Sequence, residues 1–93
     1  MEYKIMIHQA CDSVGVAVAD LSAGETARGI VAADGSTVEI KVRTDIPLPH
    51  KVAVKPVAQG ENIIIYGWPC GFATQPIAPG DHVHVHNMAS ARW

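Results

Sequence analysis

The chain has 93 residues and nearly balanced charge, with nine acidic and seven basic side chains and a formal net charge of −2. A chain of this length forms one domain around one small core, and its balanced charge excludes the basic surface that nucleic acid or an anionic membrane requires. No apolar run reaches membrane-spanning length and the N-terminus lacks a signal-peptide pattern, so we expect a cytoplasmic protein.

Frequent glycines and prolines, with β-branched residues between them, predict an all-β fold without a helix longer than about three turns. The clearest strand is "TVEIKV", because its three aliphatic residues alternate with Glu39 and Lys41. "NIIIYG" is a continuous apolar run of the kind that is buried on both faces. The expected strands are Tyr3–His8, Val14–Ala19, Thr37–Val42, Lys51–Val57, Asn62–Tyr66, Gly71–Gln75 and His82–His86.

Three short segments share a pattern that predicts a repeated turn. They are "LSAGE" (Leu21–Glu25), "VAQGE" (Val57–Glu61) and "IAPGD" (Ile77–Asp81). We expect each glycine to adopt the left-handed conformation and each acid to close its turn through the backbone. "ADGS" at Ala33–Ser36 predicts a two-residue hairpin loop with positive φ at its Asp-Gly pair. The uneven spacing of the turns excludes a solenoid and favours a compact, barrel-like domain.

The proline-rich segment "DIPLPHK" is expected to form a rigid, extended corner. Pro47 and Pro49 fix their own φ angles and restrict the residue before each of them. The corner would set the direction of His50 and Lys51. A lysine beside a histidine is suited to binding a carboxylate or a sulfonate.

The segment "GDHVHVHNM" places His82, His84 and His86 at alternate positions. In a strand, all three imidazoles would project from one face while Val83 and Val85 enter the other. Neighbouring histidines would then have Cα atoms roughly 6.5–7 Å apart and the outer pair roughly 13 Å apart, so at most two could share one metal ion. The residues alone leave three roles open: an exposed sheet face, a binding site for a polar acid, or a metal site.

Other metal ligands are scarce near these histidines. Asp81 would alternate to the opposite face of the strand, and no carboxylate cluster stands nearby. Cys11 and Cys70 lie far apart without a C-x-x-C pair, so we expect both to be reduced. A self-sufficient metal site is therefore not expected.

Four remaining aromatic side chains have less distinctive patterns. His8 ends an alternating strand and Tyr66 precedes a glycine, so each can be an ordinary structural residue. Trp68 and Trp93 are candidates for a protein interface, because a small domain with 48% apolar residues rarely buries two indoles completely. We therefore expect self-association or binding to a larger polypeptide.

Taken together, the segments "IHQACDSVGVAVADLSAGE", "DIPLPHKVAVKPVAQGE", "IIIYGWPCGFAT" and "IAPGDHVHVHN" resemble the SAF domain of the altronate and galactarate dehydratase family. The family pattern runs I-H, D-x-V-x-V-A, I-x-x-G-H-K-x-A, Y-G-x-x-I-G-x-A and I-x-x-G-x-H-V-H-x-H-N. The resemblance covers nearly the whole chain. In two departures, Pro49 replaces the glycine before His50 and Cys70 replaces an aliphatic residue, and neither removes a polar group.

The resemblance implies a β-clip fold and a single SAF domain over residues 1–93. SAF domains of this family either precede a large catalytic domain or form a separate small subunit, and a chain this short resembles the small subunits of two-component lyases for sulfolactate or sugar acids. Such a chain would be active only with its large partner subunit. The implied reaction is β-elimination from a 2-hydroxy acid, in which a base removes the proton next to the carboxylate and water or sulfite leaves.

The resemblance also implies residue roles and a cofactor. A divalent metal, expected to be iron, would stabilise the enediolate and be held mostly by the large subunit. Whether the general base lies on this chain is open. The expected catalytic residues are His84 and His86, and the expected substrate-binding residues are His8, His50, Lys51, Tyr66 and His82.

Two other functions are compatible with the residues. A non-catalytic SAF module would bind a sugar acid as a sensor or scaffold. A free-standing metal-binding β domain is the other possibility, but the cupin pattern, with a glycine well upstream of H-x-H and a glutamate after it, is absent. A neighbouring gene for a large dehydratase-like protein would favour the subunit.

Overall fold

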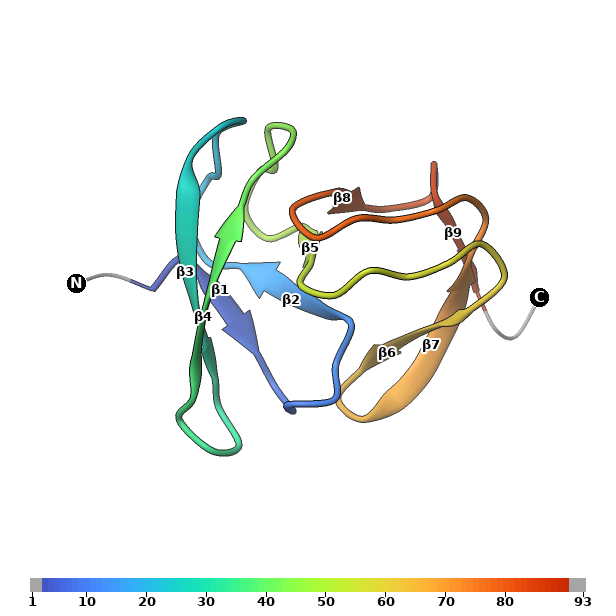
Figure 1. Ribbon diagram of the computed structural model, residues 1–93, viewed down its shortest axis with the longest axis horizontal. Coiled ribbons are helices and arrows are strands. Elements are labelled where there is room, and N and C mark those ends of the chain that lie inside the picture. Colours follow the sequence, from blue (N-terminus) through green and yellow to red (C-terminus); the bar gives the residue numbers. More distant parts are fainter. Residues whose placement is uncertain (1–2, 91–93) are drawn as a thin grey trace.

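The computed structural model describes residues 3–90, which form two sheets (Figure 1). The larger sheet has six strands in the order β4-β3-β1-β2-β5-β8, and only its β1–β3 pair is parallel. The smaller sheet has the order β6-β7-β9 and is antiparallel. The strands are β1 (Ile5–Ile7), β2 (Val14–Ala17), β3 (Thr26–Val31), β4 (Thr37–Lys41), β5 (Lys51–Ala53), β6 (Asn62–Ile65), β7 (Trp68–Ala73), β8 (His82–Val83) and β9 (Met88–Ser90).

The described residues contain no helix, so the all-β prediction is confirmed. The six-stranded sheet curls into part of a barrel, and the smaller sheet lies beside the half of it that contains β2, β5 and β8 (Figure 1). One apolar cluster fills the curl and includes Ile5, Ile46 and Val52. A second cluster lies where the two sheets meet and includes Val14 and Ile63. The domain therefore has two adjoining cores.

The repeated turn is confirmed in all three predicted places. Gly24, Gly60 and Gly80 have φ angles of +91°, +88° and +92°. In each turn, the acid side chain accepts a hydrogen bond from the backbone N–H three residues before it. These bonds join Ser22 N–H to Glu25 at 2.6 Å, Ala58 N–H to Glu61 at 2.7 Å, and Ala78 N–H to Asp81 at 2.8 Å.

Strands β3 and β9 were not predicted from the sequence, and most of the predicted strands are shorter in the structure. Gly29 lies in the middle of β3, and a glycine inside a run of residues weakens the prediction of a strand there. A Cβ at this position would lie 3.1 Å from Val38 Cγ2 and 3.3 Å from Ile5 Cβ. Glycine therefore permits the close packing of β3 against both neighbouring strands.

Two local predictions need correction. β6 is an edge strand in which only Ile63 is fully buried, so the run "NIIIYG" is not buried on both faces. In the "ADGS" segment only Gly35 has positive φ, and its N–H bonds the Val31 carbonyl at 2.8 Å. The loop is therefore longer than two residues, with Asp34 Oδ1 accepting the Ser36 N–H at 2.9 Å.

Candidate active site

The histidine segment is mostly a turn. β8 ends at Val83, and the Asn87 N–H donates to the His84 carbonyl at 3.0 Å. The predicted strand over His82–His86 is therefore wrong beyond its first two residues. Val85, which was expected on the core side, has 82% of its surface exposed.

The buried side chain of Asn87 is the physical reason for this turn. Its Oδ1 accepts the His84 N–H at 3.0 Å, and its Nδ2 donates to the His82 carbonyl at 2.8 Å. Only 4% of Asn87 is exposed. These side-chain bonds replace the backbone ladder that a longer strand would need.

The turn gathers four imidazoles, those of His50, His82, His84 and His86, into what we call the histidine cluster. His82 lies at its centre, with its ring centroid 4.9 Å from that of His50, 5.6 Å from His84 and 5.4 Å from His86. The His50 and His84 centroids are 5.0 Å apart. A straight strand would have separated His82 and His86 by about 13 Å. The imidazoles therefore converge instead of spreading along one strand face.

His50 reaches the cluster from the proline-rich corner. The Leu48–Pro49 peptide is cis, and the His50 N–H donates to the Pro47 carbonyl at 2.8 Å, so the corner is a tight turn and not an extended segment. His50 Nδ1 lies 2.8 Å from His82 Nε2. Because a hydrogen bond needs one donor, the two imidazoles share a single N–H···N bond.

The pKa of His82 is lowered from its ordinary value. Partial burial is the largest cause, and repulsion from positive charge on His50, His84 and His86 adds to it. Neutral His82 is therefore favoured near pH 7. It can hold its hydrogen bond to His50 without adding charge to the cluster.

The exposed residues His84 and His86 form the solvent side of the cluster. His84 Nδ1 accepts the Val85 N–H at 2.9 Å, so the proton of a neutral His84 ring sits on Nε2. Within residues 3–90, no hydrogen bond reaches a ring nitrogen of His86. The two imidazoles therefore differ: His84 presents a donor, and His86 is available as a donor or an acceptor.

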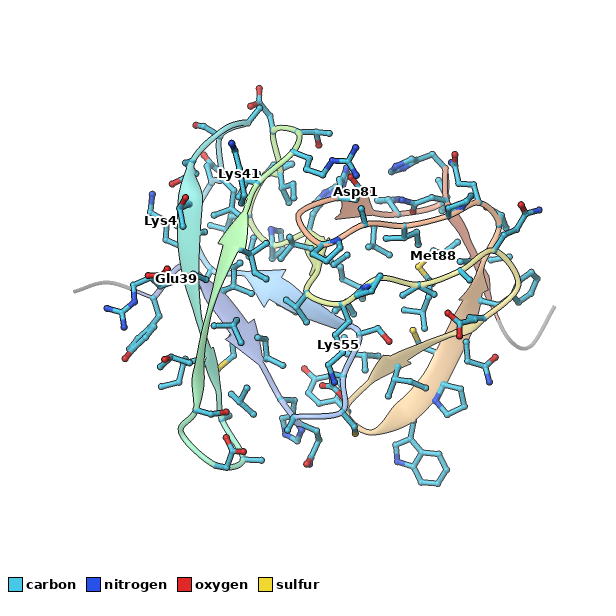
Figure 2. The ribbon with its side chains drawn as sticks, viewed as in Figure 1. Lys4, Glu39, Lys41, Lys55, Asp81 and Met88 are labelled. Atoms are coloured by element: carbon cyan, nitrogen blue, oxygen red, sulfur yellow. The ribbon has the colours of Figure 1, made fainter. Side chains whose placement is uncertain are left out.

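Two cavities flank the cluster, near the segment that runs between the labelled Asp81 and Met88 in Figure 2. The first, of about 280 Å³, lies between Lys51, Cys70 and His84. Burial raises the pKa of the Cys70 thiol, while the charge of Lys51 acts in the opposite direction. Lys51 is thus placed beside the cluster, on the His84 side.

The second cavity, of about 220 Å³, is lined by His82, His86 and Asp81. Asp81 was expected on the opposite face, but the turn brings all three to the same space. Its carboxylate accepts the Ala78 N–H and lies 3.4 Å from a nitrogen of Arg43. Asp81 is therefore held by its own turn and by an ion pair.

His8 and Tyr66 form a separate pair. Their ring centroids are 4.4 Å apart in an edge arrangement, at a groove of about 230 Å³ that is otherwise lined by apolar residues such as Met6 and Ile65. No ring contact or hydrogen bond joins this pair to the histidine cluster within the described range. Tyr66 is 56% exposed, so it is not a core residue. The substrate-binding roles of His8 and Tyr66 stay predictions.

Asp12 supports the segment that carries Tyr66, and no role was predicted for it from the sequence. It is fully buried, and its carboxylate accepts the N–H groups of Gln9, Tyr66 and Gly67 at 3.1, 3.0 and 2.9 Å. Tyr66 has φ of +57°, a conformation that is costly without such support. Asp12 is the acid of the motif D-x-V-x-V-A, which was the signal for it.

Among the described residues, no group of three or more His, Cys, Asp or Glu side chains is arranged to hold a metal ion. His50 and His82 direct nitrogens at each other, and His84 Nδ1 is occupied by a backbone N–H. The cluster therefore does not fit a metal centre of its own. No helix of the described part is long and apolar enough to cross a membrane.

The chain matches the family described as altronate/galactarate dehydratase SAF domain over residues 3–91. It belongs to this family. It is 37% identical over 94 residues to the (2R)-sulfolactate sulfo-lyase subunit alpha of Chromohalobacter salexigens, with all of both chains covered. It is 36% identical over 64 residues to the protein of the same name from Paracoccus pantotrophus, covering 69% of this chain and 96% of that one.

A second kind of relative is much longer. The chain is 46% identical over 87 residues to the altronate dehydratase of Escherichia coli, which covers 94% of this chain and 16% of that enzyme. The same SAF domain therefore occurs as a subunit named alpha and as a small part of a larger enzyme.

Proposed function

We propose that this chain is the small subunit of a two-component lyase that eliminates sulfite or water from a 2-hydroxy acid. Its similarity to a sulfo-lyase subunit alpha over the full length of both chains supports the subunit role. The observation that carries the catalytic role is the convergence of four imidazoles beside Lys51 at an open surface. A large subunit would close this surface around the substrate.

Lys51 and the cluster would bind the negative charge of the acid. The ammonium of Lys51 supplies positive charge at the cavity that it shares with His84, and His84 Nε2 supplies a hydrogen-bond donor. His82 and His50 lie behind these groups and hold their relative positions through the shared N–H···N bond. The binding role is therefore divided between an exposed layer and a supporting layer.

Elimination also requires transfer of the proton from the carbon next to the carboxylate. Imidazole suits this step, because its pKa lies near the working pH. We assign proton transfer to His86, whose side chain is exposed and whose ring nitrogens accept no backbone bond in the described structure. His84 would serve as the hydrogen-bond donor to the substrate.

We place the divalent metal, expected to be iron, on the large subunit, because residues 3–90 of this chain do not fit a metal centre. The metal would supply Lewis-acid stabilisation of developing negative charge. This chain is assigned only substrate binding and proton transfer.

The proposal is tested by reconstitution with the product of a neighbouring large dehydratase-like gene, loaded with iron without oxygen. The complex should eliminate sulfite from sulfolactate, or water from altronate or galactarate, while neither subunit alone turns over. A chain that binds a sugar acid by itself but adds no activity to the large protein would support the sensor module instead.

A further inference from the structure

The structure contains a fourth, related turn at Ile46–His50, closed by the same backbone hydrogen bond but without the positive-φ glycine and the acid. Ile46 is buried and pairs with Leu21, just as Val57 pairs with Ile77. The N–H of its last residue, His50, donates to the carbonyl three residues earlier at 2.8 Å. The same backbone bond closes the other turns, from Glu25 to Ser22 at 3.1 Å, from Glu61 to Ala58 at 2.9 Å and from Asp81 to Ala78 at 3.0 Å. His50 thus takes the position that an acid holds elsewhere.

The fourth turn has Pro49, after a cis peptide, in place of the positive-φ glycine, and it also differs in the residue that follows the aliphatic one. In the other three turns, the N–H of this residue donates to the acid side chain. Pro47 occupies the position in the fourth turn and has no N–H. The Leu48 N–H donates to Asp20 Oδ1 at 3.0 Å, so the side chain of His50 accepts no backbone hydrogen bond from within its own turn.

We infer that Pro47 is a positioning residue that directs the imidazole of His50 to His82. Nδ1 of histidine occupies the same place along the side chain as a carboxylate oxygen of aspartate, and His84 Nδ1 already accepts a backbone N–H in this structure. An N–H at position 47 would compete for the same nitrogen of His50 that now lies 2.8 Å from His82 Nε2. Because proline removes that competitor, the His50 ring stays in the cluster.

The role of Pro47 in catalysis rests on the proposed function. The hydrogen bond between His50 and His82 can be measured in the full chain without the large subunit. Scalar coupling across the N–H···N bond, measured by NMR, should join His50 Nδ1 to His82 Nε2. In Pro47→Ala this coupling should disappear, and a coupling from His50 Nδ1 to the backbone nitrogen of position 47 should replace it. The matched control is Pro79→Ala, which removes a proline from another copy of the turn and should leave the His50–His82 coupling intact. Retention of that coupling in Pro47→Ala overturns the inference.

A converse variant tests the same principle away from the cluster. The pKa of Glu25 is lowered chiefly by the hydrogen bond from the Ser22 N–H, with a smaller contribution from Lys4. Ser22→Pro removes that N–H at a position where the fourth turn shows that proline fits. The pKa of Glu25 should rise toward its ordinary value, and an unchanged Glu25 titration would contradict the premise that the N–H at this position of the turn holds the side chain of the last residue.

Activity separates this inference from the proposed function. In the reconstituted complex, Pro47→Ala should lower kcat by up to about a hundredfold, the effect that a displacement of about 1 Å can have, while Pro79→Ala retains full activity. An inactive complex with the unaltered chain would refute the proposed function and leave the coupling result standing. Full kcat in Pro47→Ala, together with a retained coupling, would refute the positioning role.

Discussion

The four imidazoles of the histidine cluster are chemically distinct because each has different partners. His50 and His82 share one hydrogen bond, His84 has its Nδ1 occupied, and His86 has neither constraint. A single strand face would have made the three C-terminal histidines equivalent. The turn therefore gives the histidines the different hydrogen-bonding states that the proposed donor and proton-transfer roles require.

His82 should make the free energy of unfolding depend on pH. Its folded-state pKa lies below the ordinary value of about 6.5, so the unfolded chain binds more protons between those two values. The contribution of His82 to stability is therefore complete above about pH 6.5 and declines as pH falls below it. Urea unfolding between about pH 5 and 8 should show a shallower pH dependence for His82→Gln than for the unaltered chain. His8→Gln is the control, and equal slopes for His82→Gln and the unaltered chain would contradict the account.

Asp12 should be the most costly single carboxylate to remove. Asp12→Ala removes the acceptor of three part-buried hydrogen bonds, which should lower the free energy of unfolding by about 3 kcal/mol. Chemical denaturation provides the measurement. Glu39→Ala, at an exposed position on β4, should change it by less than about 0.5 kcal/mol. Similar values for the two variants would show that the Asp12 clamp contributes little.

At the scale of elements, the glycines of the repeated turns all have positive φ, but they differ in how much space surrounds the position of a Cβ atom. A Cβ at Gly24 would meet no atom within 4 Å, whereas one at Gly80 would collide with the Lys41 carbonyl oxygen. Gly24→Ala should therefore cost only the left-handed conformation, about 1–2 kcal/mol. Gly80→Ala should cost clearly more by thermal or urea unfolding, and equal costs would contradict this ranking.

The turns could be predicted from sequence because their chemistry is local. Glycine supplies the positive φ and the acid accepts an N–H three residues away, so five residues contain the whole interaction. The end of β8 at Val83 could not be predicted, because alternating His and Val residues are compatible with a continued strand as well as with a turn. The deciding contacts come from the buried side chain of Asn87.

The site was only partly predictable for the same reason. The resemblance indicated the residues of the histidine cluster, but the contact between His50 and His82 spans 32 positions and depends on the pairing of β5 with β8. Asp12 belongs to the motif D-x-V-x-V-A, but its contacts with residues 54 and 55 positions away could not be inferred from that motif alone. His8 and Tyr66 were grouped with the cluster by the resemblance, and the described structure places them at a separate groove.

At the scale of the molecule, the domain leaves large apolar side chains at its surface. Trp68 is 75% exposed on β7, in keeping with its prediction as an interface residue, while Trp93 lies outside the described residues. Exposed aromatic residues are typical of interface cores. This surface should be covered in the assembled enzyme.

Trp68→Ser should therefore weaken association with the large subunit, or between copies of this chain, by at least about tenfold, as is usual for an interface hot spot. Analytical ultracentrifugation and titration of the large subunit provide the measurement. Tyr3→Ser, at another exposed aromatic residue, is the control. Equal affinities for both variants would exclude Trp68 from the interface.

The most direct test of the central claim is the turnover of the reconstituted complex carrying His84→Ala or His86→Ala. Both side chains are exposed, so both variants should fold and assemble normally. Loss of a proton-transfer group or a substrate donor should lower kcat by about 10²–10⁴-fold, while Glu39→Ala leaves it unchanged. If both histidine variants assemble and turn over at the rate of the unaltered complex, the histidine cluster is not part of the active site.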